Sequence, residues 1–97
     1  MLDFYILSDS QRKPKPDELR EFKYAGGLEA GTFDRLIKKG IIDSRFDVYS
    51  DFRWGNKILR QIDIKTRDFR SDSDVKALKK IIDKALKTKN GLIAYGD

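Results

Sequence analysis

Aspartates at four-residue spacing come closest in this sequence to a set of catalytic acids. Asp43, Asp47 and Asp51 would lie on one face of a continuous helix, where neighbouring carboxylates can act as general acid and general base. However, Gly40 and a helix-capping residue at Ser50 interrupt such a helix. We therefore expect these acids to stabilise turns and helix starts.

Two further patterns suggest a bound ion or phosphate. Asp68, Asp72 and Asp74 have part of the spacing of a calcium loop but lack its turn glycine and its late glutamate, so we interpret them as acids at a helix start. The glycine-rich stretch 26–32 resembles a phosphate-binding loop, but Gly31 directly precedes its threonine, where that signature has a lysine. We expect ordinary turn glycines there.

The chain contains no histidine and no cysteine. The commonest general base, the thiol nucleophile and the usual zinc ligands are therefore excluded. We predict that the protein is not an enzyme and holds no cofactor and no metal. One enzymatic alternative remains, a carboxylate- or metal-dependent activity, which requires several of Asp43, Asp47, Asp51 and Asp97 to converge in one cleft.

Positive charge is concentrated in one segment near the end of the chain. Residues 76–89 contain six lysines and one aspartate, so they carry the whole net charge of +5. On a helix spanning 74–89, four of these lysines share the outer side, a geometry that follows a phosphate backbone. This helix favours sequence-nonspecific nucleic-acid binding as an alternative function, although lysines also solvate ordinary helix surfaces. The four are Lys76, Lys80, Lys84 and Lys87.

The segment 49–54 (YSDFRW) combines aromatic residues with arginine. Tyr, Trp and Arg dominate the binding energy of protein interfaces, and three aromatics in six residues exceed what one helix face hides. Our leading hypothesis is therefore a non-catalytic protein-binding module. The predicted partner-binding residues are Tyr49, Asp51, Arg53 and Trp54. In the competing interpretation Trp54 belongs to the core, so its exposure decides between the two.

Two stretches resemble a group of known proteins. Residues 40–54 (GIIDSRFDVYSDFRW) and 91–97 (GLIAYGD) are similar to segments of short uncharacterised bacterial proteins, some of which accompany secreted toxins as immunity proteins. The resemblance implies a small cytoplasmic protein that neutralises a partner by covering it. It implies no active-site residues.

Short apolar runs at the two ends of the chain predict strands. Residues 2–7 are almost continuously apolar, as in a strand covered on both faces. Residues 92–95 are typical of a buried terminal strand, which we expect to pair near the first. Residues 8–17 contain two prolines and predict a surface loop, whereas residues 17–24 fit either a helical turn or a strand.

Helical periodicity predicts three helices between these strands. The first is capped by Thr32 and ends at Gly40. The second is capped by Ser50 and begins near residue 51, and the third runs from the capping residues 71–74 towards Gly91. The residues of their inward faces are Phe33, Leu36 and Ile37; Trp54, Ile58, Leu59 and Ile62; and Val75, Leu78, Ile81, Ile82, Ala85 and Leu86.

Ninety-seven residues with 39% hydrophobic content predict one domain, 1–97, around one core. We expect an α/β fold, with α+β as the variant, in which short N-terminal and C-terminal strands share a sheet covered by about three helices. No apolar run approaches the roughly 20 residues of a membrane span, and no secretory signal is evident, so we expect a cytoplasmic protein. A sheet this small also allows a homodimer through strand pairing.

Overall fold

The computed structural model describes residues 1–96, leaving aside the side chain of Pro16. Within them the chain forms an α/β domain around one antiparallel sheet, in the order β2-β1-β4-β3. Because every strand pair is antiparallel, it is the α+β variant. The strands are β1 (Leu2–Leu7), β2 (Tyr24–Leu28), β3 (Phe52–Trp54) and β4 (Gly91–Gly96).

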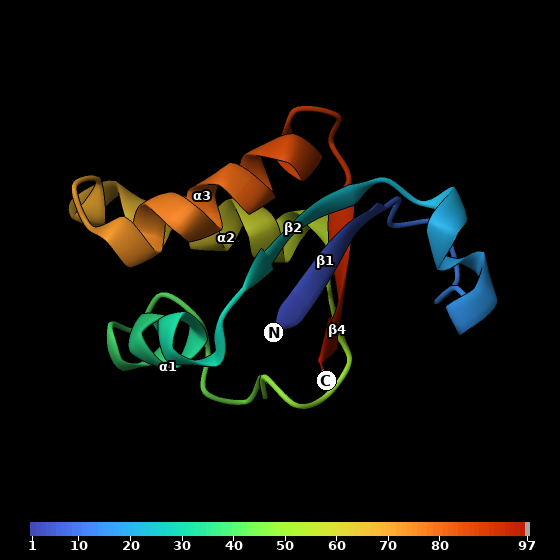
Figure 1. Ribbon diagram of the computed structural model, residues 1–97. Coiled ribbons are helices and arrows are strands. Elements are labelled where there is room, and N and C mark those ends of the chain that lie inside the picture. Colours follow the sequence, from blue (N-terminus) through green and yellow to red (C-terminus); the bar gives the residue numbers. More distant parts are fainter. Residues whose placement is uncertain (97) are drawn as a thin grey trace.

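The two strands at the chain ends form the centre of the sheet. β1 pairs with β4 from Leu2 opposite Gly96 to Leu7 opposite Gly91, which confirms the predicted pairing of the terminal segments. Figure 1 shows the two ends of the chain close together on these neighbouring strands. β4 has a neighbouring strand on each side, and its residues 91–94 are all buried.

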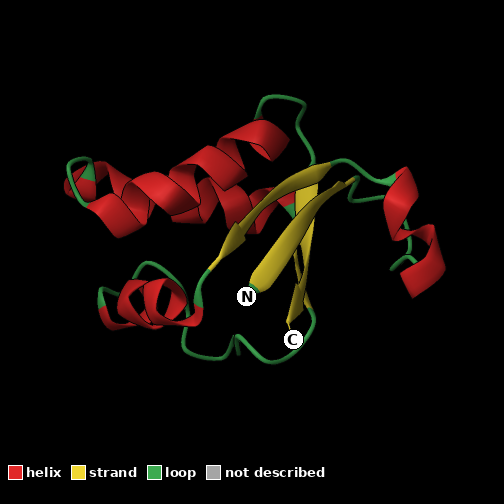
Figure 2. Ribbon diagram, viewed as in Figure 1, coloured by secondary structure: helices red, strands yellow, loops and turns green. Residues whose placement is uncertain are grey.

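The three α-helices lie together on one side of the sheet (Figure 2). In the described part of the chain the α-helices are α1 (Ala30–Lys38), α2 (Asn56–Thr66) and α3 (Ser73–Leu86). The short 3-10 helices are η1 (Pro16–Glu21) and η2 (Arg67–Phe69). The apolar faces of the three α-helices and the side of the sheet that faces them form the core. Its fully buried residues include Phe4, Phe33, Trp54, Leu59, Leu78 and Ile82.

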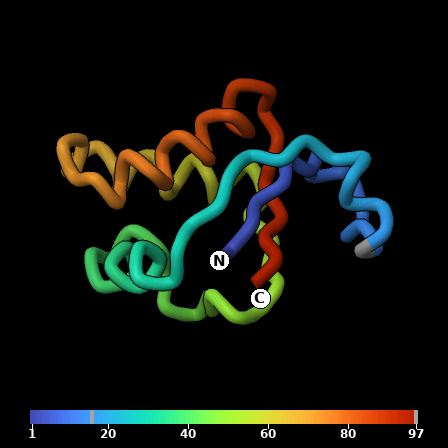
Figure 3. The backbone as a smooth tube through the Cα atoms, in the orientation of Figure 1, coloured from blue at the N-terminus to red at the C-terminus, as the bar shows by residue number. Residues whose placement is uncertain are grey.

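The other side of the sheet is only partly covered. Residues 8–23, with η1, fold back over the end where β1 stops (Figure 3). Leu7 and Ile93 are buried outside the main core. Arg53 fastens this segment, since its guanidinium donates to the carbonyl oxygens of Ser8 (2.7 Å) and Gln11 (2.6 Å). The prediction that β1 is covered on both faces is therefore right only at its Leu7 end.

The third predicted helix is confirmed as α3. Asp72 is its N-cap and accepts hydrogen bonds from the backbone amides of Asp74 (2.9 Å) and Val75 (3.1 Å). The first predicted helix is also present, as α1, but it begins two residues before Thr32.

No helix in residues 1–96 is long and apolar enough to cross a lipid bilayer.

The prediction of a helix capped by Ser50 is wrong. Residues 52–54 pair with β4 as β3, and α2 begins only at Asn56. Its first amide donates to the carboxylate of Asp9 (3.0 Å), so the capping acid comes from a distant part of the chain. The pairing with β4 overrides the local helical pattern because it buries Trp54 against the core.

Residues 17–24, for which a helical turn and a strand were both expected, contain part of each. The 3-10 helix η1 ends at Glu21, and the strand β2 begins at Tyr24. Gly26 and Gly27 lie within β2, so the expectation that they are ordinary turn glycines is wrong. Gly26 has a φ of +141°, and a Cβ there would stand 2.9 Å from Cγ1 of Ile81. Glycine thus permits both the strand's irregular backbone and the close approach of α3.

Candidate binding surfaces

The structure separates the residues of the predicted aromatic and arginine cluster. On β3, Phe52 and Trp54 point towards the helices, whereas Arg53 points to the opposite face, because successive strand residues alternate. Trp54 has no exposed surface, and its ring lies 5.3 Å from that of Phe4. The assignment of Trp54 to a partner-facing surface is therefore wrong.

The other predicted partner-binding residues remain accessible. Tyr49 is 73% exposed and lies in the loop that runs beside the end of β4, where its backbone approaches Gly96. The carboxylate of Asp51 pairs with the Lys13 ammonium at 3.6 Å. Arg53 is half-buried by the contacts that fasten residues 8–23. The structure thus brings Asp51 and Arg53 to the edge of the sheet face turned away from the helices.

Three tyrosines occupy the same face. Tyr24, Tyr5 and Tyr95 come from the adjacent strands β2, β1 and β4. The ring centroids of Tyr24 and Tyr5 are 5.4 Å apart and those of Tyr5 and Tyr95 are 6.2 Å apart, both in edge-on geometry. Tyr24 is 48% exposed, and the other two are half-buried. We call this surface the tyrosine face; its residues are Asp3, Tyr5, Lys13, Tyr24, Asp51, Arg53 and Tyr95.

Hydrogen bonds fix the outer tyrosines of the row. Tyr24 donates its hydroxyl proton to Oδ1 of Asp3 (2.9 Å), and Tyr95 donates to the carbonyl oxygen of Pro14 (3.3 Å). Burial and the bond to Asp3 raise the pKa of Tyr24, and burial and the nearby Asp51 raise the pKa of Tyr95. Both phenols are therefore neutral hydrogen-bonding groups at physiological pH.

The charges of the tyrosine face balance. Two carboxylates, Asp3 and Asp51, stand against the two cations Lys13 and Arg53, and the Lys13 ammonium lies 5.9 Å from the Tyr95 ring centre. Sequence reasoning missed the tyrosines because their common face depends on strand pairing. The alternation of Asp3 and Tyr5 with apolar neighbours is the local signal that points to an open face.

The predicted basic helix presents its lysine stripe to solvent. Lys76, Lys80 and Lys84 on α3, and Lys87 directly after it, are all exposed, as the helical spacing predicts. Lys84 differs, because its ammonium donates to the carbonyl oxygen of Ala25 in the edge strand β2 (3.0 Å). It is held by a structural contact and does not belong with the free lysines.

A cleft of about 260 Å³ opens where α2 and α3 meet through η2. Arg67, Arg70 and Lys76 line it and have no ion-pair partner among the described residues. Lys79 also lines it but pairs with Asp63 and with Asp83. Burial by itself lowers the pKa of Lys79, and the hydrogen bonds that it donates to these two acids outweigh burial and raise it. Sequence reasoning missed the two arginines, which precede the helix and meet its lysines only through the turn.

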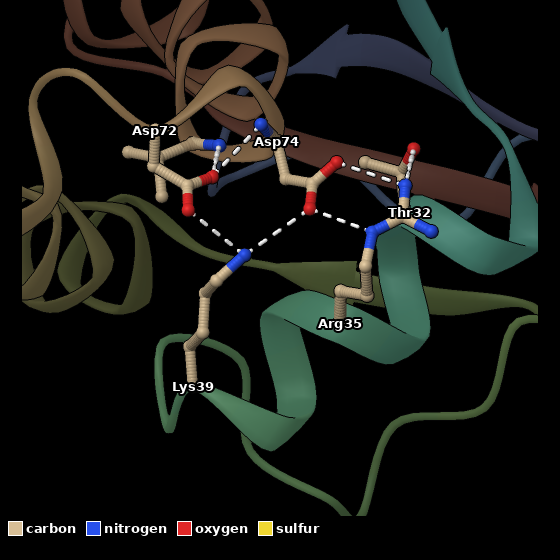
Figure 4. Close-up of polar contacts among 6 residues, drawn as sticks. Thr32, Arg35, Lys39, Asp72 and Asp74 are labelled. Carbon is tan, nitrogen blue, oxygen red and sulfur yellow. Dashed lines mark hydrogen bonds and ion pairs between the residues drawn. The ribbon is translucent and has the colours of Figure 1, made fainter.

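The acids at the start of α3 hold α1 in place (Figure 4). Asp74 accepts hydrogen bonds from Nε (2.7 Å) and Nη2 (2.9 Å) of Arg35 and from Nζ of Lys39 (3.1 Å). Lys39 also pairs with Asp72 at 2.9 Å. The hydrogen bonds from Arg35 and then from Lys39 hold the pKa of Asp74 at about 2, against the opposing effect of burial. The interpretation of Asp72 and Asp74 as helix-start acids is confirmed.

Asp43 and Asp47 act within turns. Oδ1 of Asp43 accepts the amide of Arg45, and Oδ1 of Asp47 accepts the amide of Tyr49, each at 2.9 Å, which confirms their interpretation as turn acids. Across residues 1–96 no three acidic side chains come together as metal ligands do, and Asp97 lies outside the described residues.

Comparison of the chain with protein-family models, with curated proteins and with solved structures finds no match.

Proposed function

We propose that this protein is a non-catalytic protein-binding module whose contact surface is the tyrosine face. The observation that carries the proposal is the row of Tyr24, Tyr5 and Tyr95 on three adjacent strands. The α-helices of residues 1–96 pack against the other side of the sheet, where Phe4, Trp54 and Ala94 belong to the core. Tyrosine combines a large apolar ring with a hydroxyl and loses little conformational entropy on binding. Rings already held by neighbouring rings and hydrogen bonds lose still less.

The charges of this face favour a protein partner over a nucleic acid. Bases stack on exposed aromatic rings, but such platforms are combined with a positively charged groove for the backbone. Here Asp3 lies beside Tyr24, and Asp51 lies near Tyr95, so a polyanion meets two carboxylates. A protein surface with matching donors, acceptors and charges of both signs suits the face better.

An immunity-like role agrees with this kind of surface. A protein that neutralises a partner by covering it requires a preformed face and no catalytic group. The resemblance of residues 40–54 and 91–97 to short bacterial proteins, some of them immunity proteins, supports that role. The absence of cysteine supports a cytoplasmic location.

Affinity capture from the native cells tests the proposal with matched variants. Tyr24→Glu places a charge at the exposed end of the tyrosine row, and Lys80→Glu places one on the exposed side of α3. We expect one protein to be captured by the wild type and by Lys80→Glu, and to be lost with Tyr24→Glu. Capture of that protein by Tyr24→Glu at the wild-type level would contradict the proposal.

A second candidate function is sequence-nonspecific nucleic-acid binding through α3. The observation that favours it is the exposure of Lys76, Lys80 and Lys87 on one side of the helix. Such binding weakens steeply with salt, and Lys80→Glu reduces it. The wild-type contact between Lys84 and β2 makes Lys84 a poor position for this test. Absence of binding to mixed-sequence DNA and RNA at low salt would remove this candidate.

A further inference from the structure

We propose that the cleft between α2 and α3 binds a phosphate group, carried by a small phosphorylated molecule. The cleft lies among the helices, away from the tyrosine face. The proposal is therefore independent of the protein-binding function, and either can fail without the other.

The cleft carries positive charge that no acidic side chain within residues 1–96 compensates. Arg67 is the first residue of η2, Arg70 directly follows η2, and Lys76 comes from the first turns of α3. All three are exposed around one opening, and none has an acidic partner in the part of the chain that the structure describes. Three cations around one opening repel each other, and a bound anion relieves that repulsion.

The neighbouring acids do not cancel this charge. Asp63 lines the cleft but is paired with Lys79. Asp72 and Asp74, at the start of α3, are paired with Lys39 and Arg35 of the α1 region. We call these ion pairs, shown in Figure 4, the clamp between α1 and α3. Because the clamp neutralises both carboxylates, they do not repel an anion in the cleft. Asp68 is exposed and does not line the cleft.

The type of anion follows from the donors and the shape. Arginine presents paired N–H groups that match two oxygens of a phosphate, and a phosphate dianion balances more of three positive charges than a carboxylate does. The inner wall includes Val75 and Thr66, both buried, which suits the organic part of the ligand. A volume of about 260 Å³ exceeds the requirement of one phosphate and approaches the roughly 300 Å³ at which small-molecule pockets begin.

Titrations followed by backbone amide NMR test the site with defined probes. The probes are inorganic phosphate, adenosine monophosphate, acetate, and one short oligonucleotide with and without a 5′-phosphate. We expect saturable shifts at the amides of Val75 and Lys76 with phosphate and adenosine monophosphate, and none with acetate. A preference for the 5′-phosphorylated oligonucleotide would support the site with a nucleic-acid end as the phosphate source. Equal shifts with both oligonucleotides, without saturation by phosphate, would overturn it in favour of general backbone contact.

Variants separate the cleft from overall charge. The double variant Arg67→Gln with Arg70→Gln removes both guanidinium groups, and we expect it to weaken binding of adenosine monophosphate at least tenfold, or about 1.4 kcal/mol. The control, Arg20→Gln with Arg12→Gln, makes the same change of charge in the exposed segment on the other side of the sheet. Equal weakening by the two double variants, or no binding by the wild type at millimolar concentrations, would overturn the proposal.

Discussion

Arg53 and Trp54 are neighbours on β3, yet their side chains lie on opposite faces of the sheet. The Trp54 ring contacts Phe4 in the core, whereas the Arg53 guanidinium holds residues 8–23 against the other face. A one-residue change in strand register exchanges the two faces, so pairing with β4 decides which of them meets solvent. The same pairing directs Tyr95 to the open face and Ala94 to the core.

The placement of Trp54 predicts a large effect on stability. Trp54→Ala leaves a cavity in the core and should lower the free energy of unfolding by about 3–5 kcal/mol. Tyr49→Ala removes a side chain that is 73% exposed and should change it by no more than about 0.5 kcal/mol. Urea unfolding followed by circular dichroism measures both. Similar losses for the two variants would contradict the assignment of Trp54 to the core.

Gly26 should not tolerate a side chain. Gly26→Ala introduces a Cβ 2.9 Å from Ile81 at a φ of +141°, so strain and a clash act together and should cost about 2–4 kcal/mol. Gly40→Ala is the matched control, because Gly40 also has positive φ (+76°) but has open space around it. We expect a loss of about 1–2 kcal/mol there from backbone strain alone. Thermal unfolding of the two variants at equal concentration measures the difference, and a smaller loss at Gly26 would contradict the close packing of α3 on β2.

The clamp between α1 and α3 should make the free energy of unfolding depend on pH in the acidic range. Asp74 has a pKa of about 2 in the folded protein, first because of its hydrogen bonds from Arg35, and an ordinary aspartate in the unfolded chain titrates near pH 3.9. A carboxyl group with a lowered folded pKa stabilises the fold above its unfolded pKa. That contribution is lost as the pH falls through the folded value. The expected window is therefore from about pH 4 down to about pH 2.

Asp74→Asn tests this window. The variant lacks the contribution at every pH, so wild type and variant should differ most in free energy of unfolding near neutral pH and converge as the pH falls from about 4 to about 2. In an Arg35→Gln background the same substitution should have a smaller effect, because the principal donor is already absent. A difference that does not change between pH 5 and pH 2 in urea unfolding would count against the clamp.

Lys84 should protect the protein from self-association. Its ammonium occupies the Ala25 carbonyl oxygen in β2, a strand at the edge of the sheet, where free backbone groups invite pairing with a second copy. We expect Lys84→Ala to show concentration-dependent dimers in sedimentation velocity, and Lys87→Ala, which removes an exposed lysine one turn away, to remain like the wild type. Identical sedimentation of both variants would show that the edge needs no such protection.

The local sequence pattern was sufficient to predict β1, β4 and α3. The apolar runs of β1 and β4 and the capped, periodic sequence of α3 identified those elements. In each of them the buried residues lie within one short, continuous segment of the sequence. β2 and β3 were not predicted, since Gly26 and Gly27 are poor strand residues and segment 52–54 is short. These strands exist because β1 and β4 offer them hydrogen-bonding partners.

The candidate sites depended still more on distant contacts. Tyr5, Tyr24 and Tyr95 form one row only through the strand order β2-β1-β4, and Arg67 meets Lys76 only because η2 reverses the chain. The Asp9 carboxylate that caps α2 lies 47 residues before the amide that it accepts. Local spacing of residues carries no information about such contacts.

Site-specific photocrosslinking in the native cells tests the tyrosine face most directly. A benzophenone amino acid at position 24 places the reactive group on that face, and the same group at position 80 places it on the exposed side of α3. If the tyrosine face is the contact surface, position 24 should yield one discrete protein adduct and position 80 should not. A discrete adduct from position 80 alone would contradict the account.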